Sequence, residues 1–162
     1  MQTSTAHQQT QNGFQTVFVA LGSGDANRVE QLAEKTIDLA GPSGARVVLG
    51  HVFTREAYQE RREALNFGPD SEVTPDVIAR RFGVVRDLAD ALEAADVDHE
   101  VRGALGDYGQ GIAGLAEEEG ADLVVVGGRK RSPTGKAVFG STAQEVMLSA
   151  HCPVTFVRGD SA

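Results

Sequence analysis

The sequence has little cysteine, lysine or tryptophan: it contains one cysteine, three lysines and no tryptophan among 162 residues. The lone Cys152 cannot form an internal disulfide, which fits a reducing cytoplasm. A single cysteine also excludes a zinc cluster built from cysteines. No apolar run approaches the roughly 20 residues of a membrane-spanning helix. Residues 1–13 lack the basic and apolar segments of a secretory signal. We expect a cytoplasmic protein with no membrane partner and a disordered polar tail over residues 1–13.

Positive charge is scarce as well. The chain carries 23 acidic and 15 basic residues, a formal net charge of -8. Nucleic-acid binding needs positive charge distributed along a phosphate backbone, so the balance argues against a nucleic-acid partner. The excess of carboxylates and a sequence pI near 4.9 resemble proteins from salt-loving organisms, which predicts a haloarchaeal-type protein.

Against this background, four basic residues gather in one glycine-rich segment: Arg129, Lys130, Arg131 and Lys136. Glycines let main-chain N–H groups approach an anion, and the N-terminus of a following helix adds unpaired donors and partial positive charge. The segment therefore predicts a site for phosphate or a similar anion. The alternative is an ordinary surface loop with solvated basic side chains.

Apolar runs alternate with amphipathic stretches, as in βαβ units around a parallel sheet. The predicted strands are 14–21, 45–53, 97–102, 121–126 and 153–158. The predicted helices are 26–40, 55–65, 75–95, one between Asp107 and Gly120, and 141–150, capped by Ser141. The length suits one domain, 14–160, with the α/β fold of a single open five-stranded sheet. The first and fourth strands end at Gly22 and Gly127, so both glycine-rich loops are expected at the rim where such sheets bind ligands.

Two common nucleotide motifs are excluded. Around Gly135-Lys136, Lys130 stands where a P-loop has its first glycine, and Ala137 replaces the hydroxyl residue that holds magnesium. After the first strand, Asn27 stands where a dinucleotide fingerprint has its third glycine.

The segment from Gly127 to Thr142 instead resembles the nucleotide loop of the universal stress protein family, which has the pattern Gly, two residues, Gly, nine residues, Gly and then Ser or Thr. Gly127 matches the first glycine, and Gly140-Ser141 match the end at the same spacing. The resemblance extends over nearly the whole chain after the tail. It implies an adenine nucleotide alpha hydrolase-like fold with strand order 3-2-1-4-5, binding of ATP or AMP with Mg or Mn on the phosphates, and a homodimer formed through the last strand.

The resemblance assigns roles to matching positions. It implies that Gly127 lets the main chain approach phosphates, that Gly140 permits the turn into the helix, and that Ser141 and Thr142 donate hydrogen bonds to phosphates. Val52 matches the place where the main chain meets adenine. For Ser141 a plain N-cap is the alternative.

Charge and position alone add Arg129 and Lys130 to the candidate site. Two departures from the family pattern bear on affinity: Lys130 replaces a glycine, and Gly22 stands where an acidic residue often contacts adenosine. Lys130 either contacts phosphate or fills the pocket. We expect ATP to bind more weakly than with the complete motif, or not at all.

No residues point to catalysis. His51 and His99 lie at or beside strands, where a hydrogen-bonded structural role is favoured, and no paired carboxylates or metal-ligand spacing occur. The main hypothesis is a stress-response protein that binds an adenine nucleotide and signals as a dimer. The alternatives are a nucleotide-independent dimeric interaction protein of the same fold and, less favoured, a slow ATPase.

Overall fold

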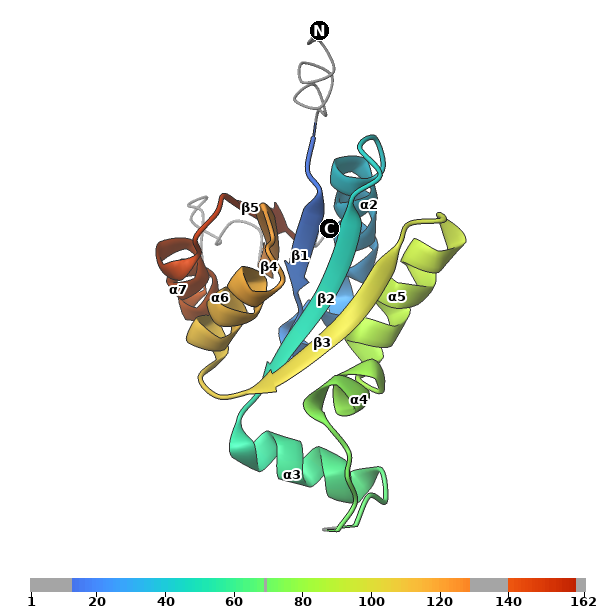
Figure 1. Ribbon diagram of the computed structural model, residues 1–162, viewed down its shortest axis with the longest axis vertical. Helices are drawn as coiled ribbons and strands as arrows, with labels where there is room; N and C mark the ends of the chain where they lie inside the picture. Colours follow the sequence, from blue (N-terminus) through green and yellow to red (C-terminus); the bar gives the residue numbers. More distant parts are fainter. Residues whose placement is uncertain (1–12, 69, 129–139, 160–162) are drawn as a thin grey trace, which may run out of the picture.

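The computed structural model describes residues 13–68, 70–128 and 140–159. Arg129, Lys130 and residues 1–12 of the predicted tail lie outside the described residues. Five parallel strands form one sheet with the order β3-β2-β1-β4-β5 (Figure 1). Their bounds are β1 Thr16–Ala20, β2 Arg46–Phe53, β3 His99–Leu105, β4 Leu123–Gly128 and β5 Val154–Arg158. The predicted fold and strand order are confirmed.

Seven helical segments connect the strands in the described part of the chain. They are η1 Ser23–Arg28, α2 Val29–Ala40, α3 Arg55–Ala64, α4 Pro75–Arg80, α5 Gly83–Ala94, α6 Tyr108–Glu118 and α7 Ser141–Ser149. None of them combines the length and apolarity that a membrane crossing requires.

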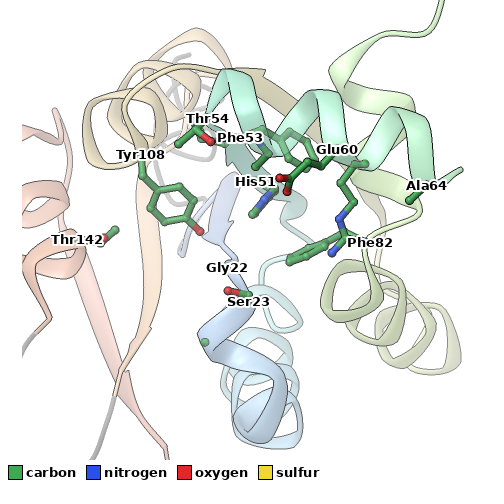
Figure 2. Close-up of a pocket in the computed structure, with 14 residues that line it drawn as sticks. Gly22, Ser23, His51, Phe53, Thr54, Glu60, Ala64, Phe82, Tyr108 and Thr142 are labelled. Atoms are coloured by element: carbon green, nitrogen blue, oxygen red, sulfur yellow. Dashed lines mark hydrogen bonds between the residues drawn. The ribbon is translucent and has the colours of Figure 1, made fainter. Parts of the chain in front are cut away.

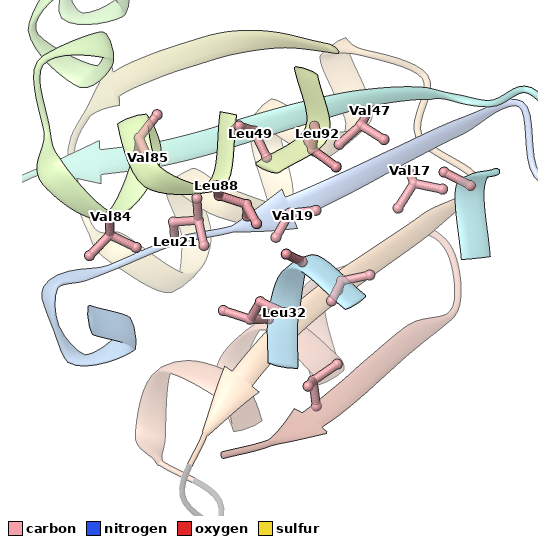
Figure 3. Packing of buried hydrophobic residues seen from close by; sticks show 14 of the residues in the cluster. Val17, Val19, Leu21, Leu32, Val47, Leu49, Val84, Val85, Leu88 and Leu92 are labelled. Carbon is pink, nitrogen blue, oxygen red and sulfur yellow. The ribbon is translucent and has the colours of Figure 1, made fainter. Parts of the chain in front are cut away.

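Alternate side chains along the strands point to opposite faces of the sheet and form two apolar layers. On one face, Val17, Val19 and Leu21 pack with side chains of α2 and α5 (Figure 3). On the other face, Phe18 and Ala20 pack with α6 and α7. Both faces of the central strands are therefore covered, which explains the near-continuous apolar runs of β1 and β4.

The predicted helix over residues 75–95 is two helices. The chain leaves the helical conformation at Phe82, which has φ -75° and ψ 127°, and α5 begins at Gly83. Phe82 is 5% exposed. Its ring stacks on that of His51 in β2. This tertiary contact and the low helix propensity of Gly83 explain why a single helix does not run through residues 75–95.

Smaller differences concern the ends of elements. The predicted helix over 26–40 begins with the 3-10 segment η1, because the Asp25 carboxylate accepts from the Gly22 main-chain N–H and tightens this turn. Gly120 ends α6 with φ +67°, as the sequence predicts. The predicted N-cap of α7 is wrong by one residue: Gly140 is the cap and Ser141 is the first helical residue.

Candidate functional site

Two adjoining cavities open where β1, β2 and β4 end. The larger has a volume of about 730 Å³ and lies against the end of β2 and α3, and the smaller, of about 430 Å³, lies between β1, β4 and α7. Both are lined by Gly22, Gly24, Tyr108 and Thr142, so they form one cleft. Strand order reverses between β1 and β4, and open parallel sheets bind ligands at that point.

The smaller cavity contains the start of α7. Gly140, Ser141 and Thr142 line it, and the first helical hydrogen bond runs from the Gln144 N–H to the Gly140 carbonyl. The N–H groups of Ser141 and Thr142 precede that bond, so they have no acceptor within the helix. This wall of the cavity therefore offers main-chain donors and two hydroxyl groups to an anion.

The main-chain conformation of Gly140 does not require a glycine. Its φ of -68° and ψ of 162° are open to any residue, so the turn into α7 does not require glycine as the resemblance implied. A Cβ there would meet no atom of the described residues within 4 Å.

A buried ion pair closes the other side of the smaller cavity. The Arg28 Nη1 donates to an Asp25 carboxylate oxygen and to the Gly24 carbonyl, the latter at 2.8 Å. The side chains of Arg28 and Asp25 are only 13% and 10% exposed. The second carboxylate oxygen of Asp25 accepts from the Gly22 N–H at 2.9 Å. The pair fixes the loop after β1 and leaves this wall without net charge.

Close approach explains two of the glycines that line the cleft. A Cβ on Gly127 would lie 2.8 Å from Asp25 Oδ1 and 2.9 Å from Arg28 Cδ. A Cβ on Gly22 would lie 2.5 Å from the Tyr108 hydroxyl oxygen. The departure from the family pattern at Gly22 therefore has a structural reason, because the Tyr108 hydroxyl fills the space that a side chain would need.

The larger cavity is lined by rings. His51 is 8% exposed and stacks on Phe82, with ring centroids 4.3 Å apart and an interplanar angle of 27° (Figure 2). The edges of Phe53 and Tyr108 pack against it at 4.4 and 5.8 Å. The Arg61 guanidinium lies over Phe82, 4.8 Å from its centroid. Such a wall suits a flat ring that also forms a few polar contacts.

Two side chains converge on the Leu21 carbonyl at the end of β1. His51 Nδ1 lies 2.7 Å from this oxygen, and the Tyr108 hydroxyl donates to it. Burial lowers the pKa of His51, with a smaller contribution from the nearby charge of Arg61. Burial has the opposite effect on the Tyr108 hydroxyl and raises its pKa, because burial disfavours the charged form of each group. Near neutral pH both side chains are therefore uncharged.

Comparison with known proteins identifies the family. The model of the universal stress protein family matches residues 13–158. The chain belongs to the universal stress protein family. Two curated relatives are a universal stress protein of Mycolicibacterium smegmatis, 34% identical over 48% of this chain and 61% of the relative, and one of Thermus aquaticus, 29% identical over 90% and 99%.

Solved universal stress proteins share the fold. One in complex with cAMP has a TM-score of 0.64 and 21% identity, covering 92% of this chain and 100% of that one. The protein of Archaeoglobus fulgidus in complex with dAMP has a TM-score of 0.63 and 17% identity, covering 89% and 98%. A family member of Arabidopsis thaliana with AMP bound has a TM-score of 0.60 and 17% identity, covering 91% and 93%.

The cleft of this universal stress protein contains the described residues that the sequence singles out. Gly127, Gly140, Ser141 and Thr142 line the smaller cavity, and Val52 lines the larger. That these residues bind a ligand stays a prediction. Arg129 and Lys130 lie outside the described residues, so their predicted contacts with phosphate also stay predictions.

Sequence reasoning missed Arg28, Tyr108 and the part that His51 plays in the cavity. His51 does form the hydrogen bond that its strand position suggested. Tyr108, the first residue of α6, follows β3 at the same edge of the sheet, which is a signal that a parallel fold offers. Arg28 and Asp25 are three residues apart, a spacing that pairs opposite charges in helical turns.

Proposed function

We propose that this universal stress protein is a cytoplasmic stress-response protein that binds an adenine nucleotide, AMP or ATP, in the cleft. One observation supports the proposal above the others: the donor-rich start of α7 and the ring-lined cavity adjoin, with Thr142 in both walls. The neighbours of known structure with cAMP, dAMP and AMP are bound to nucleotides of the same class. The carboxylate excess further suggests a haloarchaeal-type member that works at high salt.

The phosphates are assigned to the smaller cavity. The free N–H groups at the start of α7 favour negative charge, and the Ser141 and Thr142 hydroxyls add donors. The Arg28 and Asp25 charges offset each other, so the helix start and the predicted contacts of Arg129 and Lys130 supply the attraction. The base is assigned to the larger cavity, beside Val52 and the ring of His51.

A divalent ion would enter with the phosphates. Within the described residues no three His, Cys, Asp or Glu side chains gather as metal ligands. Both Asp25 carboxylate oxygens already accept hydrogen bonds. Mg or Mn is therefore proposed as a companion of the triphosphate, with oxygen ligands from the phosphates and water.

Calorimetric titration with AMP, ATP and inorganic phosphate, with magnesium and at low and high salt, tests the proposal. AMP and ATP are expected to bind, and Ser141→Ala is expected to weaken binding about 10-fold or more, because a hydrogen bond to a charged group contributes about 1.5–3 kcal/mol. Ser149→Ala, at the other end of the same helix, is the matched control and should bind as the wild type does.

Failure of every nucleotide to bind would contradict the proposal. The function would then be the nucleotide-independent interaction protein, with the glycine loop as an inherited feature of the fold. Phosphate release above the buffer background would instead indicate an ATPase.

We also propose a homodimer formed through β5. This strand pairs with β4 alone in the described residues and so has a free edge, which proteins usually cover. Sedimentation at micromolar concentration is expected to give a dimer. Thr155→Lys on β5 should shift it to a monomer, and His99→Lys on the opposite edge strand β3 should not. A monomeric wild-type protein would contradict this assignment.

A further inference from the structure

Among the described residues, His51 has a hydrogen-bond partner for one ring nitrogen and none for the other. Its Nδ1 lies 2.7 Å from the Leu21 carbonyl oxygen. A carbonyl oxygen only accepts hydrogen bonds, so Nδ1 carries the proton of this contact. Because burial lowers the pKa of His51, the ring is neutral and holds a single N–H. The second nitrogen, Nε2, is therefore unprotonated and can only accept a hydrogen bond.

Nε2 reaches the cavity. This atom forms no hydrogen bond to a described residue. It is also not one of the fully enclosed polar atoms that lack a partner in the described part of the chain, so its surface is open to solvent space. His51 lines the larger cavity while more than nine-tenths of the residue is buried, so the cavity is the open space beside the ring (Figure 2). Phe82 on its face and the edges of Phe53 and Tyr108 hold the ring in this orientation.

The neighbouring hydroxyl of Tyr108 can also only accept a further hydrogen bond. Tyr108 donates its proton to the Leu21 carbonyl, so its oxygen also retains only acceptor capacity. The protons of His51 Nδ1 and the Tyr108 hydroxyl are both used on the Leu21 carbonyl oxygen, so each of these two side chains keeps only an acceptor. A ligand that places a hydrogen-bond donor here satisfies them, whereas a ligand that places a carbonyl oxygen here meets lone pairs.

We propose that His51 determines the base specificity of the cleft, accepting a hydrogen bond at Nε2 from the 6-amino group of a purine and disfavouring a 6-oxo purine. The inference rests on the proposed nucleotide binding and adds to it the residue that selects the base. A site built around a buried polar group rejects ligands that leave the group unpaired, which is the source of strong discrimination in binding sites.

The test compares three nucleotides with the same ribose 5′-phosphate: AMP, IMP, which has a 6-oxo group, and purine riboside 5′-monophosphate, which has hydrogen at that position. Calorimetry of the full chain at pH 7.5 is expected to show AMP binding at least 10-fold more tightly than IMP, with the 6-hydrogen compound between them. In His51→Phe, which keeps a ring against Phe82, the ratio of AMP to IMP affinity should fall below 3-fold.

His99→Phe is the matched control. His99 Nδ1 also contacts a main-chain carbonyl, that of Val97 at 3.0 Å, but the residue lies on β3 away from the cleft. This variant should keep the wild-type preference for AMP. Nitrogen NMR of the wild type, which needs no variant to fold, should show Nε2 of His51 unprotonated and shifted by AMP but not by inorganic phosphate.

The outcomes separate the two proposals. Equal affinities of the wild type for AMP and IMP, or a protonated Nε2, would overturn the role of His51 and leave nucleotide binding intact. The same is true if His51→Phe retains the full preference. If no nucleotide binds, the proposed function fails and the specificity role fails with it.

Discussion

A Gly50→Ala variant is expected to lose about 3 kcal/mol of unfolding free energy, because the methyl group has no space in the core. Gly50 lies in β2, and a Cβ there would come within 2.9 Å of three ring carbons of Phe18. Phe18 of β1 is completely buried in the apolar layer that the sheet forms with α6 and α7, so its ring cannot move aside without disturbing the packing. Urea denaturation measures the loss as a lower midpoint.

Two further variants make the result specific. Phe18→Leu in the Gly50→Ala background removes the ring edge and is expected to recover part of the lost stability. Gly114→Ala on α6 is the matched control, because its Cβ would meet no described atom within 4 Å. Alanine inside a helix stabilises a protein by about 0.5–1 kcal/mol relative to glycine, so this variant is expected to be no less stable than the wild type. An unchanged midpoint for Gly50→Ala would contradict the packing account.

The sequence predicted the sheet and the location of the cleft for a clear physical reason. In a parallel sheet the strand ends meet at one edge, so Gly22 and Gly127 could be placed together before their contacts were known. The periodic pattern was also sufficient to find all five strands. It did not reveal the break at Phe82, since that residue fits the buried stripe of a continuous helix and only Gly83 hints at the change.

The chemistry of the cleft was less accessible to sequence. A strand position favours a hydrogen-bonded role for His51, but the accepting carbonyl, and hence which nitrogen carries the proton, depends on how β1 and β2 align. The reason for Gly22 lies in Tyr108, 86 positions further along the chain. Such contacts are set by tertiary packing, which local propensity and spacing do not encode.

An Arg28→Ala variant is expected to lose about 3 kcal/mol of unfolding free energy, because it leaves the nearly buried Asp25 carboxylate without its cation. In Asp25→Ala the Gly22 N–H loses its acceptor as well, so this variant is also expected to be less stable. The double variant should be more stable than the sum of the single losses predicts, by about 1 kcal/mol or more. Urea denaturation of the four proteins measures this coupling.

The same pair should change anion binding in opposite directions. Arg28→Ala exposes a phosphate in the smaller cavity to an uncompensated carboxylate, so affinity for inorganic phosphate and AMP should fall about 10-fold, whereas Asp25→Ala releases a cation and should raise it. Arg102→Ala is the control: its partners Asp76, Glu118 and Glu119 lie outside the cleft, so binding should not change. Equal affinities in both variants would show that phosphate does not occupy the cavity beside Gly127.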